Sequence, residues 1–166
     1  MGVLTPLARR IGAIGWLPGL LPQITAVDRW LQRASQGRLS LLTLAGLPNL
    51  MLIVPGRTSG IEHATPLLCV PQRDGWLVAG SAFGGPRTPA WAHNLRAAER
   101  AQVTFRGRTY RVTVDELSGD ERDRAWDVMS QVWPNYRLYE RRTSRVIPVF
   151  RLAPADPPFE GDIGLE

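Results

Sequence analysis

The stretch LMLIVPGRTSGIEHATPLL, residues 50–68, contains two apolar runs joined by a glycine-rich segment. The first run contains Ile and Val and lies between two proline-containing dipeptides, which is typical of a short buried strand. We therefore predict a β-hairpin whose turn is Gly56-Arg57-Thr58-Ser59-Gly60. Glycines can turn backbone N–H groups toward an oxyanion, and the Arg57 guanidinium can bind phosphate or carboxylate through two hydrogen bonds. Taken alone, such a segment is more often an ordinary turn.

Length and composition predict one globular domain. With 166 residues and 44% hydrophobic residues, the chain can bury a core without disulfides or metals. Its single cysteine, Cys69, excludes an internal disulfide and any zinc site with several cysteines. Cys69 lies in an apolar run, where a free thiol is usually a packing residue. This cysteine usage is compatible with the cytoplasm, where we expect the protein.

The positive charge of the chain comes from arginine alone. All 20 residues counted as Lys or Arg are arginine, and the formal net charge is +5. A sequence without lysine excludes Schiff-base chemistry and the lysine of a Walker motif. The positive charge favours anionic ligands. Because the arginines are spread along the chain without a nucleic-acid-reading motif, nucleic acid is not the partner we expect.

Residues 1–39 predict an N-terminal segment of amphipathic helices. Apolar residues recur there at helical spacing. The glycines and prolines of residues 15–22 interrupt the most apolar region, so no run reaches the roughly 18 to 20 apolar residues that span a bilayer. We expect this segment either to pack on the core or to contact the inner surface of a membrane. A secretory signal is a weaker alternative.

Residues 40–154 predict a domain of mainly β structure with helices, an α+β fold, and residues 155–166 predict a poorly ordered tail. Pro66 places the strand over 62–70 at a sheet edge or bulge, and a strand over 76–80 is expected to close a meander. Thr88 as N-cap and Pro89 as first residue predict a helix. The remaining predicted elements are a hairpin over 101–106 and 109–116, a helix opened by the capping box Ser118-Gly119-Asp120-Glu121, and a strand over 147–152.

Two further segments carry residues suited to ligand binding. Gly84-Gly85 and Arg87 precede the predicted helix, so its N-terminus is a second place where an anion could bind. Trp133, Tyr136 and Tyr139 recur at a spacing of three, which puts their rings on one side of a helical turn. Such rings either plug a core or hold a flat heterocycle. His93 is interpreted as a structural residue, since one histidine is too little for a metal site or a triad.

The order of these motifs resembles the deazaflavin-dependent nitroreductase family. The resemblance covers about residues 42–154 and rests on the motifs GRTSG, TPLL, GGPRTPAWAHNL and WPNYRLYERRTSRVIPV. It implies a split β-barrel of the FMN-binding, flavin-reductase type. It also implies that the chain uses the reduced 8-hydroxy-5-deazaflavin coenzyme F420 to transfer hydride to a nitroaromatic, a quinone or an activated alkene. Because barrels of this type often pair, the resemblance also implies a homodimer.

The resemblance further implies roles for particular residues. The cofactor-binding residues would be Arg57, Thr58, Ser59, Gly60, His63, Pro66, Leu67, Ser81, Arg87 and Trp91. The substrate-binding rings would be Trp133, Tyr136 and Tyr139, and the catalytic residues Tyr136, Tyr139 and Ser81. The turn would contact the phosphate and the polyglutamate tail of the coenzyme, while Pro66 and Leu67 would lie against its ring system.

Three residues depart from the family pattern. Thr58 stands where the family commonly has Lys or Arg, and His63 where it commonly has Arg, so the tail site is less positive. Each missing cation removes on the order of 1 to 3 kcal/mol where it would have made a charge-assisted bond. Trp133 stands where tyrosine is more usual and lacks its hydroxyl. We therefore expect changes in cofactor affinity and in substrate choice.

The chain offers no metal-ligand set, no paired acid and base and no activated nucleophile, which fits chemistry carried by a cofactor. The expected partner is a small-molecule hydride acceptor. A hydroxyl of Tyr136, Tyr139 or Ser81 is expected to donate a hydrogen bond to negative charge developing on that acceptor. Two alternatives stay open: a non-catalytic protein that binds deazaflavin or another flat ligand, and an FMN-dependent oxidoreductase of the same barrel type.

Overall fold

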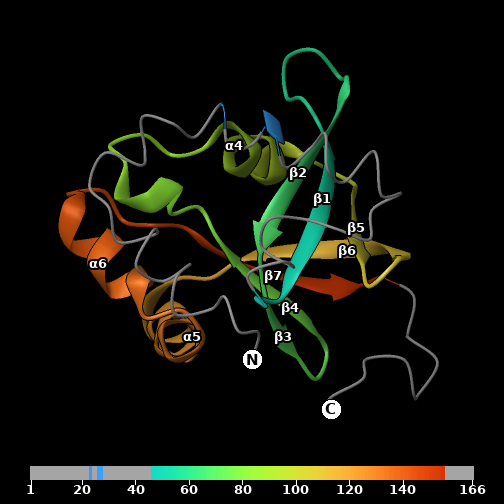
Figure 1. Ribbon diagram of the computed structural model, residues 1–166. Coiled ribbons are helices and arrows are strands. Elements are labelled where there is room, and N and C mark those ends of the chain that lie inside the picture. Colours follow the sequence, from blue (N-terminus) through green and yellow to red (C-terminus); the bar gives the residue numbers. More distant parts are fainter. Residues whose placement is uncertain (1–22, 24–25, 28–45, 156–166) are drawn as a thin grey trace.

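The computed structural model describes residues 46–155 and, before them, only Gln23, Ala26 and Val27, which are helical (Figure 1). The predictions for the other residues of the N-terminal helical segment and for the tail beyond Ala155 lie outside the described residues. In chain order the elements are β1 (Asn49–Pro55), β2 (Glu62–Leu68), β3 (Val70–Gln72), β4 (Gly75–Ala79), the short 3₁₀ helix η2 (Ala82–Gly84), α4 (Ala90–Ala97), β5 (Ala101–Phe105), β6 (Arg108–Glu116), α5 (Gly119–Val132), α6 (Asn135–Arg142) and β7 (Val149–Pro154).

The sheet curls because its two edge strands are neighbours in the sequence. Its order is β2-β1-β5-β6-β7-β4-β3, and every pair of neighbours is antiparallel. β2 and β3 therefore lie at opposite edges, although only Cys69 separates them in the chain. In a flat sheet, neighbouring strands are about 4.8 Å apart, so the two edges would be too distant for one residue to join. The predicted barrel of mainly β structure with helices is confirmed.

The hairpin formed by β1 and β2 agrees with the prediction. Leu50, Leu52 and Val54 are buried, and the residues between them are half-buried. Val54 pairs with His63 and Pro55 with Glu62, which leaves 56–61 as the connecting loop. β2 is an edge strand, where a proline is tolerated because one side of the strand needs no ladder hydrogen bonds. The predicted edge position of Pro66 is confirmed.

The prediction that the strand over 76–80 closes a meander is wrong. β4 pairs with β3 and with β7, and not with β2. Its main partner, β7, comes from the C-terminal end of the described chain. This pairing depends on contacts between distant segments, and no local pattern of residues encodes it.

Both predicted helix starts need a correction. α4 begins at Ala90 with Pro89 as its N-cap, because Pro89 has an extended ψ of 146°; Thr88 therefore lies outside the helix and is not its cap. Ser118 is the N-cap of α5, as expected, but its side chain makes no capping hydrogen bond. Gly119 follows it with a positive φ of 53°, whereas a capping box requires a regular first helical turn.

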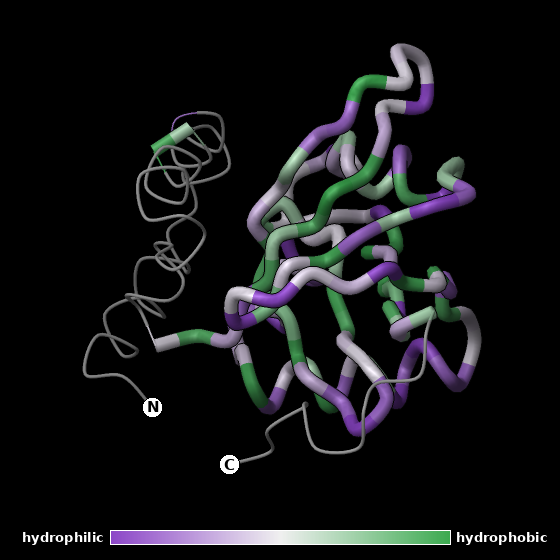
Figure 2. The backbone as a smooth tube through the Cα atoms, turned by 90° about the vertical axis from the view of Figure 1, so that its right-hand side faces the viewer, coloured by the Kyte–Doolittle hydropathy of each residue, from purple (hydrophilic) through white to green (hydrophobic). Residues whose placement is uncertain are grey.

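Two hydrophobic cores lie on the two faces of the sheet. The first fills the barrel and includes Trp76 and Phe150, with Leu95 of α4 packed against the strands. The second lies between the sheet and the pair α5 and α6 and includes Leu77 and Val149. β4 and β7 thus contribute alternate residues to the two cores, as strand geometry requires. Along the backbone tube, hydrophobic and hydrophilic residues interchange over short distances (Figure 2).

Candidate functional site

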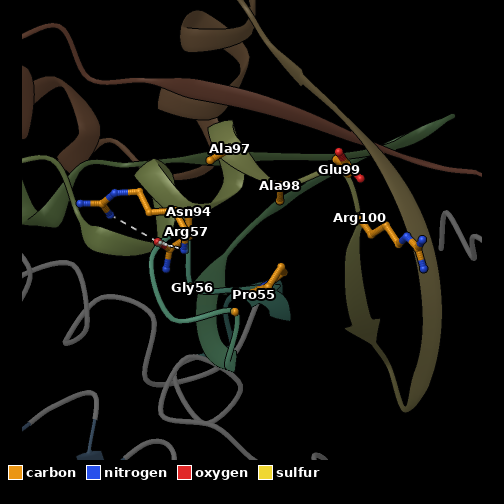
Figure 3. A pocket seen from close by; sticks show the side chains of 9 residues that line it. Pro55, Gly56, Arg57, Asn94, Ala97, Ala98, Glu99 and Arg100 are labelled. Atoms are coloured by element: carbon orange, nitrogen blue, oxygen red, sulfur yellow. Dashed lines mark hydrogen bonds between the residues drawn. The ribbon is translucent and has the colours of Figure 1, made fainter.

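A cleft of about 430 Å³ lies between the β1–β2 loop and the C-terminal half of α4. Its lining residues come from the end of β1, the loop, α4 and the segment before β5 (Figure 3): Pro55, Gly56, Arg57, Gly60, Asn94, Ala97, Ala98, Glu99 and Arg100. Of the predicted cofactor-binding residues, Arg57 and Gly60 line this cleft. Glu99 and Arg100 were not predicted, because their exposed side chains in a short connection resemble ordinary surface residues.

One oxygen atom of Asn94 holds the predicted anion-binding turn. The backbone N–H of Arg57 donates to Asn94 Oδ1 at 3.2 Å, and Arg57 Nη1 donates to the same oxygen at 3.3 Å (Figure 3). Asn94 is only 8% exposed. Asn94 is not among the predicted site residues, although an amide on the apolar face of a helix is a signal, since a buried amide needs partners. The loop is thereby fixed to α4.

The loop itself requires its glycines. Gly56 N–H donates to Ile61 O and Gly60 N–H donates to Gly56 O, both at 2.8 Å, and Gly60 has a φ of +68°. A Cβ on Gly56 would lie 2.6 Å from Ser59 Oγ and 3.0 Å from His63 Nε2. The structure thus brings Arg57, Ser59, Gly60 and His63 close together around this turn. Thr58 is exposed at the end of the hairpin.

The other predicted cofactor residues lie outside the cleft. Pro66 and Leu67 are half-buried in β2, paired with Met51 and Leu50, and Leu67 packs against the barrel core. Arg87 is exposed in the segment before α4. Trp91 is half-buried in α4, with its ring centroid 5.9 Å from that of Phe150.

Ser81 opens a turn of unusual backbone conformation. Ala82, Phe83 and Gly84 all have positive φ, at 46°, 54° and 80°. For the two residues with side chains, this conformation costs roughly 1 to 2 kcal/mol each. The carbonyls of Ser81 and Gly85 accept hydrogen bonds from Arg145, which lies between α6 and β7.

The turn is packed directly on α6. The Phe83 ring is edge-on to the Tyr139 ring at 5.7 Å, and the Phe83 carbonyl accepts a hydrogen bond from Arg142 Nη1 at 3.3 Å. A Cβ on Gly84 would lie 2.7 Å from the carbonyl oxygen of Tyr139. Segment 81–85 and α6 therefore form one packed unit, and the chain leads from it into α4 (Figure 1).

The aromatic block lies in the second core. Trp133, Tyr136 and Tyr139 are 6%, 2% and 1% exposed, and the Tyr136 ring lies 5.2 Å from Trp126. Trp133 Nε1–H donates to the Tyr139 hydroxyl at 3.3 Å. The three rings are brought together as predicted, and all three are buried.

Burial keeps both tyrosine hydroxyls protonated. Burial raises the pKa of Tyr136, and the neighbouring Tyr139 and Cys69 raise it further. Burial also raises the pKa of Tyr139, against the opposing effects of hydrogen bonds from Trp133 and Asn135 and of the Arg142 charge. Both side chains are therefore suited to hydrogen bonding as neutral hydroxyls.

Within the described residues, no group of three or more His, Cys, Asp and Glu side chains is arranged to hold a metal ion. His93 is half-buried in α4. In the described part of the chain, no helix is both long enough and apolar enough to cross a bilayer.

Comparison with known proteins identifies the relatives of this chain. The family model for F420H2-dependent quinone reductase matches residues 25–154. An F420H2-dependent quinone reductase of Mycobacterium tuberculosis is 30% identical over 130 residues, which are 76% of this chain and 87% of that protein.

Solved structures show the same fold. The F420H2-dependent reductase FDR-A superposes with a TM-score of 0.59 at 29% identity, and the match covers 63% of this chain and 93% of the FDR-A chain. A protein solved as a domain-swapped dimer has a TM-score of 0.62 at 27% identity, and the match covers 76% of this chain and 93% of that protein's chain. The predicted split β-barrel and the predicted relationship to deazaflavin-dependent enzymes are confirmed, with quinone reductase as the family description. The matched region includes the whole sheet, the cleft and the aromatic block, and the chain belongs to the F420H2-dependent quinone reductase family.

Proposed function

We propose that this chain is an F420H2-dependent reductase whose acceptor is a quinone. Family membership supports the cofactor, and the name of the Mycobacterium tuberculosis relative supports the acceptor class. The structural observation that carries the proposal is the Arg57 guanidinium, which Asn94 holds in place at a cleft of about 430 Å³. A guanidinium fixed in this way suits the phosphate and the glutamate carboxylates of F420.

The residues around the cleft fit such an anion. Arg57 and Arg100 both line the cleft, but their guanidinium groups point to opposite sides of it (Figure 3), so we propose that Arg57 alone binds the anion. The backbone N–H groups of Gly56, Arg57 and Gly60 are used inside the protein, so the loop presents its side chains to the anion. We propose that Thr58, Ser59, Gly60 and His63 contribute to the same tail site.

When bound, reduced F420 supplies a hydride. We propose that Pro66, Leu67 and Trp91 offer the apolar surface for its ring system, and that Ser81 and Arg87 contribute polar contacts. Trp133, Tyr136 and Tyr139 would form the acceptor side of the site and exclude water from it.

One titration tests the proposal against its alternatives. Purified protein is mixed with F420 and, separately, with FMN, and cofactor fluorescence is followed; F420H2 oxidation is then measured with a quinone and with a nitroaromatic. Quenching of F420 fluorescence followed by quinone-dependent oxidation is the expected result. F420 binding without turnover of either acceptor would support the non-catalytic binding protein, and binding of FMN alone would support the FMN-dependent enzyme. Faster turnover of the nitroaromatic would move the proposal to that acceptor class.

We also propose that the chain forms a homodimer. The support is a structural relative at 27% identity that was solved as a domain-swapped dimer. Light scattering coupled to size-exclusion chromatography measures the mass, which should be twice the 18.4 kDa of the chain. Contact of the N-terminal segment with a membrane stays a prediction from the sequence.

A further inference from the structure

We infer that Arg145 is a positioning residue: it holds the left-handed turn 81–85 against α6 and thereby sets the positions of Ser81 and α4 for binding of F420. The inference rests on the proposed function for the identity of the ligand. Arg145 belongs to the segment RTSRVIP, residues 142–148. None of the roles proposed above involves its side chain.

One planar group joins the two ends of the turn. Arg145 Nε–H donates to the Gly85 carbonyl at 3.0 Å, and Arg145 Nη2–H donates to the Ser81 carbonyl at 2.9 Å. Adjacent guanidinium donors have a fixed spacing, so the fork sets the separation of the two carbonyl oxygens. A lysine ammonium is a point charge without this geometry.

The turn needs such a restraint because its backbone is strained. Ala82 and Phe83 have positive φ although both carry a Cβ, and the next residue, Gly84, continues in the same region. The Phe83 ring packs on Tyr139 and Gly84 lies directly against the α6 backbone, so both are needed for packing. Ala82 carries only a methyl group, and glycine at this position would relieve its strain.

Within the described residues, one buried hydrogen-bond donor of Arg145 is unsatisfied. Its Nη1 is buried and has no hydrogen-bond partner among the described residues. Loss of solvent around the guanidinium also lowers the pKa of Arg145. A buried donor without a partner is unfavourable, so the arrangement is explained by the two carbonyls that the side chain holds.

A shift of the turn would reach the cleft through α4. The chain runs from Gly85 into α4, which begins at Ala90 and carries Asn94, the residue that holds Arg57. Ser81 lies at the other end of the turn, where its carbonyl accepts the second hydrogen bond from Arg145. Arg145 thus acts on Ser81 directly, and on Arg57 through α4 and Asn94.

The test uses four variants of the full chain: Arg145→Gln, Arg145→Lys, Arg145→Gln with Ala82→Gly, and the control Arg141→Gln. Arg141 is exposed in the last turn of α6 and lies outside the proposed site. Three quantities are measured: the Kd for F420 by fluorescence, the hydrogen exchange of residues 81–88 without cofactor, and the thermal midpoint.

We expect Arg145→Gln to raise the Kd about 10-fold and to speed exchange in 81–88, because the glutamine side chain ends near the position of Arg145 Nε and lacks the Nη2 donor that reaches the Ser81 carbonyl. Arg145→Lys should raise the Kd similarly, by about 5- to 10-fold. Added to Arg145→Gln, Ala82→Gly should restore the Kd to within about 3-fold of wild type by removing strain that Arg145 no longer offsets. Arg141→Gln should change neither the Kd for F420 nor the hydrogen exchange of residues 81–88.

A folded Arg145→Gln protein with wild-type F420 affinity would overturn the inference, and so would a failure of Ala82→Gly to restore binding. If Arg145→Gln does not fold, Arg145→Lys with and without Ala82→Gly makes the same comparison. Wild-type protein that binds no F420 would refute the proposed function. The exchange of 81–88, measured without cofactor, would still show whether Arg145 restrains the turn.

Discussion

Asn94 shows how much of the site depends on a single buried amide. Its Oδ1 accepts hydrogen bonds from both the backbone and the side chain of Arg57, and both bonds cross from α4 to the β1–β2 loop. The position of Arg57 in the turn can be read from the sequence, and its role as an anion-binding cation is a proposal. The sequence does not identify Asn94 as the partner of Arg57, because that contact joins residues 37 positions apart and depends on where α4 packs.

Asn94→Ala should therefore weaken F420 binding by about 10-fold, since the Arg57 guanidinium loses its fixed position. The measurement is the Kd for F420 by fluorescence. Arg96→Ala is the matched control, because Arg96 belongs to the same helix and pairs instead with Glu116. Equal losses in the two variants would show that the effect comes from α4 as a whole.

Tyr136→Phe should lower kcat more than it weakens F420 binding, by about 10-fold against about 2-fold, if its hydroxyl assists the acceptor. Stopped-flow oxidation of F420H2 by a quinone gives the first quantity and fluorescence titration the second. Equal losses of both would place this ring in the cofactor pocket instead.

The raised pKa values of Tyr136 and Tyr139 give a further expectation for pH dependence. A neutral hydroxyl whose pKa lies above the usual value of about 10 remains a donor up to at least that pH. The kcat profile of wild type should thus show no tyrosine-dependent fall below about pH 10. A fall near pH 9 that disappears in Tyr136→Phe would contradict this assignment.

At the scale of elements, local patterns predicted most strands and helices. The alternation and turn residues of β1, β5 and β6 were sufficient, since each hairpin encodes its own register. The cap of α4 was misplaced by one residue because the sequence TP offers two neighbouring starts. The left-handed turn at Ala82 and Phe83 could not be predicted, because it is imposed by packing on α6 and by Arg145.

Gly84→Ala should destabilise the protein by about 2 to 4 kcal/mol, combining a positive φ with a clash against the Tyr139 carbonyl. Thermal or urea unfolding measures the change. Gly107→Ala is the control, since Gly107 has a similar φ of +82° but no atom within 4 Å of its added Cβ. It should cost only about 1 kcal/mol, and equal effects would show that packing against α6 contributes nothing.

At the scale of the whole molecule, the sequence indicated the class of fold but not the order of its strands. Composition and the hairpins predicted a mainly β domain, whereas the pairing of β4 with β7 joins segments far apart in the chain. Burial of Cys69 between the two edge strands follows from that same closure. As expected from the sequence, this thiol is a packing residue.

Cys69 should make folding stability sensitive to alkaline pH. Burial raises the pKa of the folded thiol, with a smaller opposing effect of the Arg106 charge. The unfolded thiol ionises near pH 8.5, so above that pH the unfolded state loses a proton that the folded state keeps, and stability falls by up to about 1.4 kcal/mol per pH unit. Urea unfolding of wild type and Cys69→Ala between pH 7 and 10 measures the two slopes. Parallel slopes would show that another group is responsible.

The chain crosses through Cys69 from one edge of the sheet to the other, and this connection also affects how the barrel unfolds. The edge strands β2 and β3 are joined by a single residue, so neither can separate from the sheet alone, because the movement of one strand pulls on the other. Loss of β2 from β1 therefore disturbs the hold of β3 on β4 at the same moment. Such a barrel should open in one concerted step, with amide exchange in both edge strands reporting the same opening free energy.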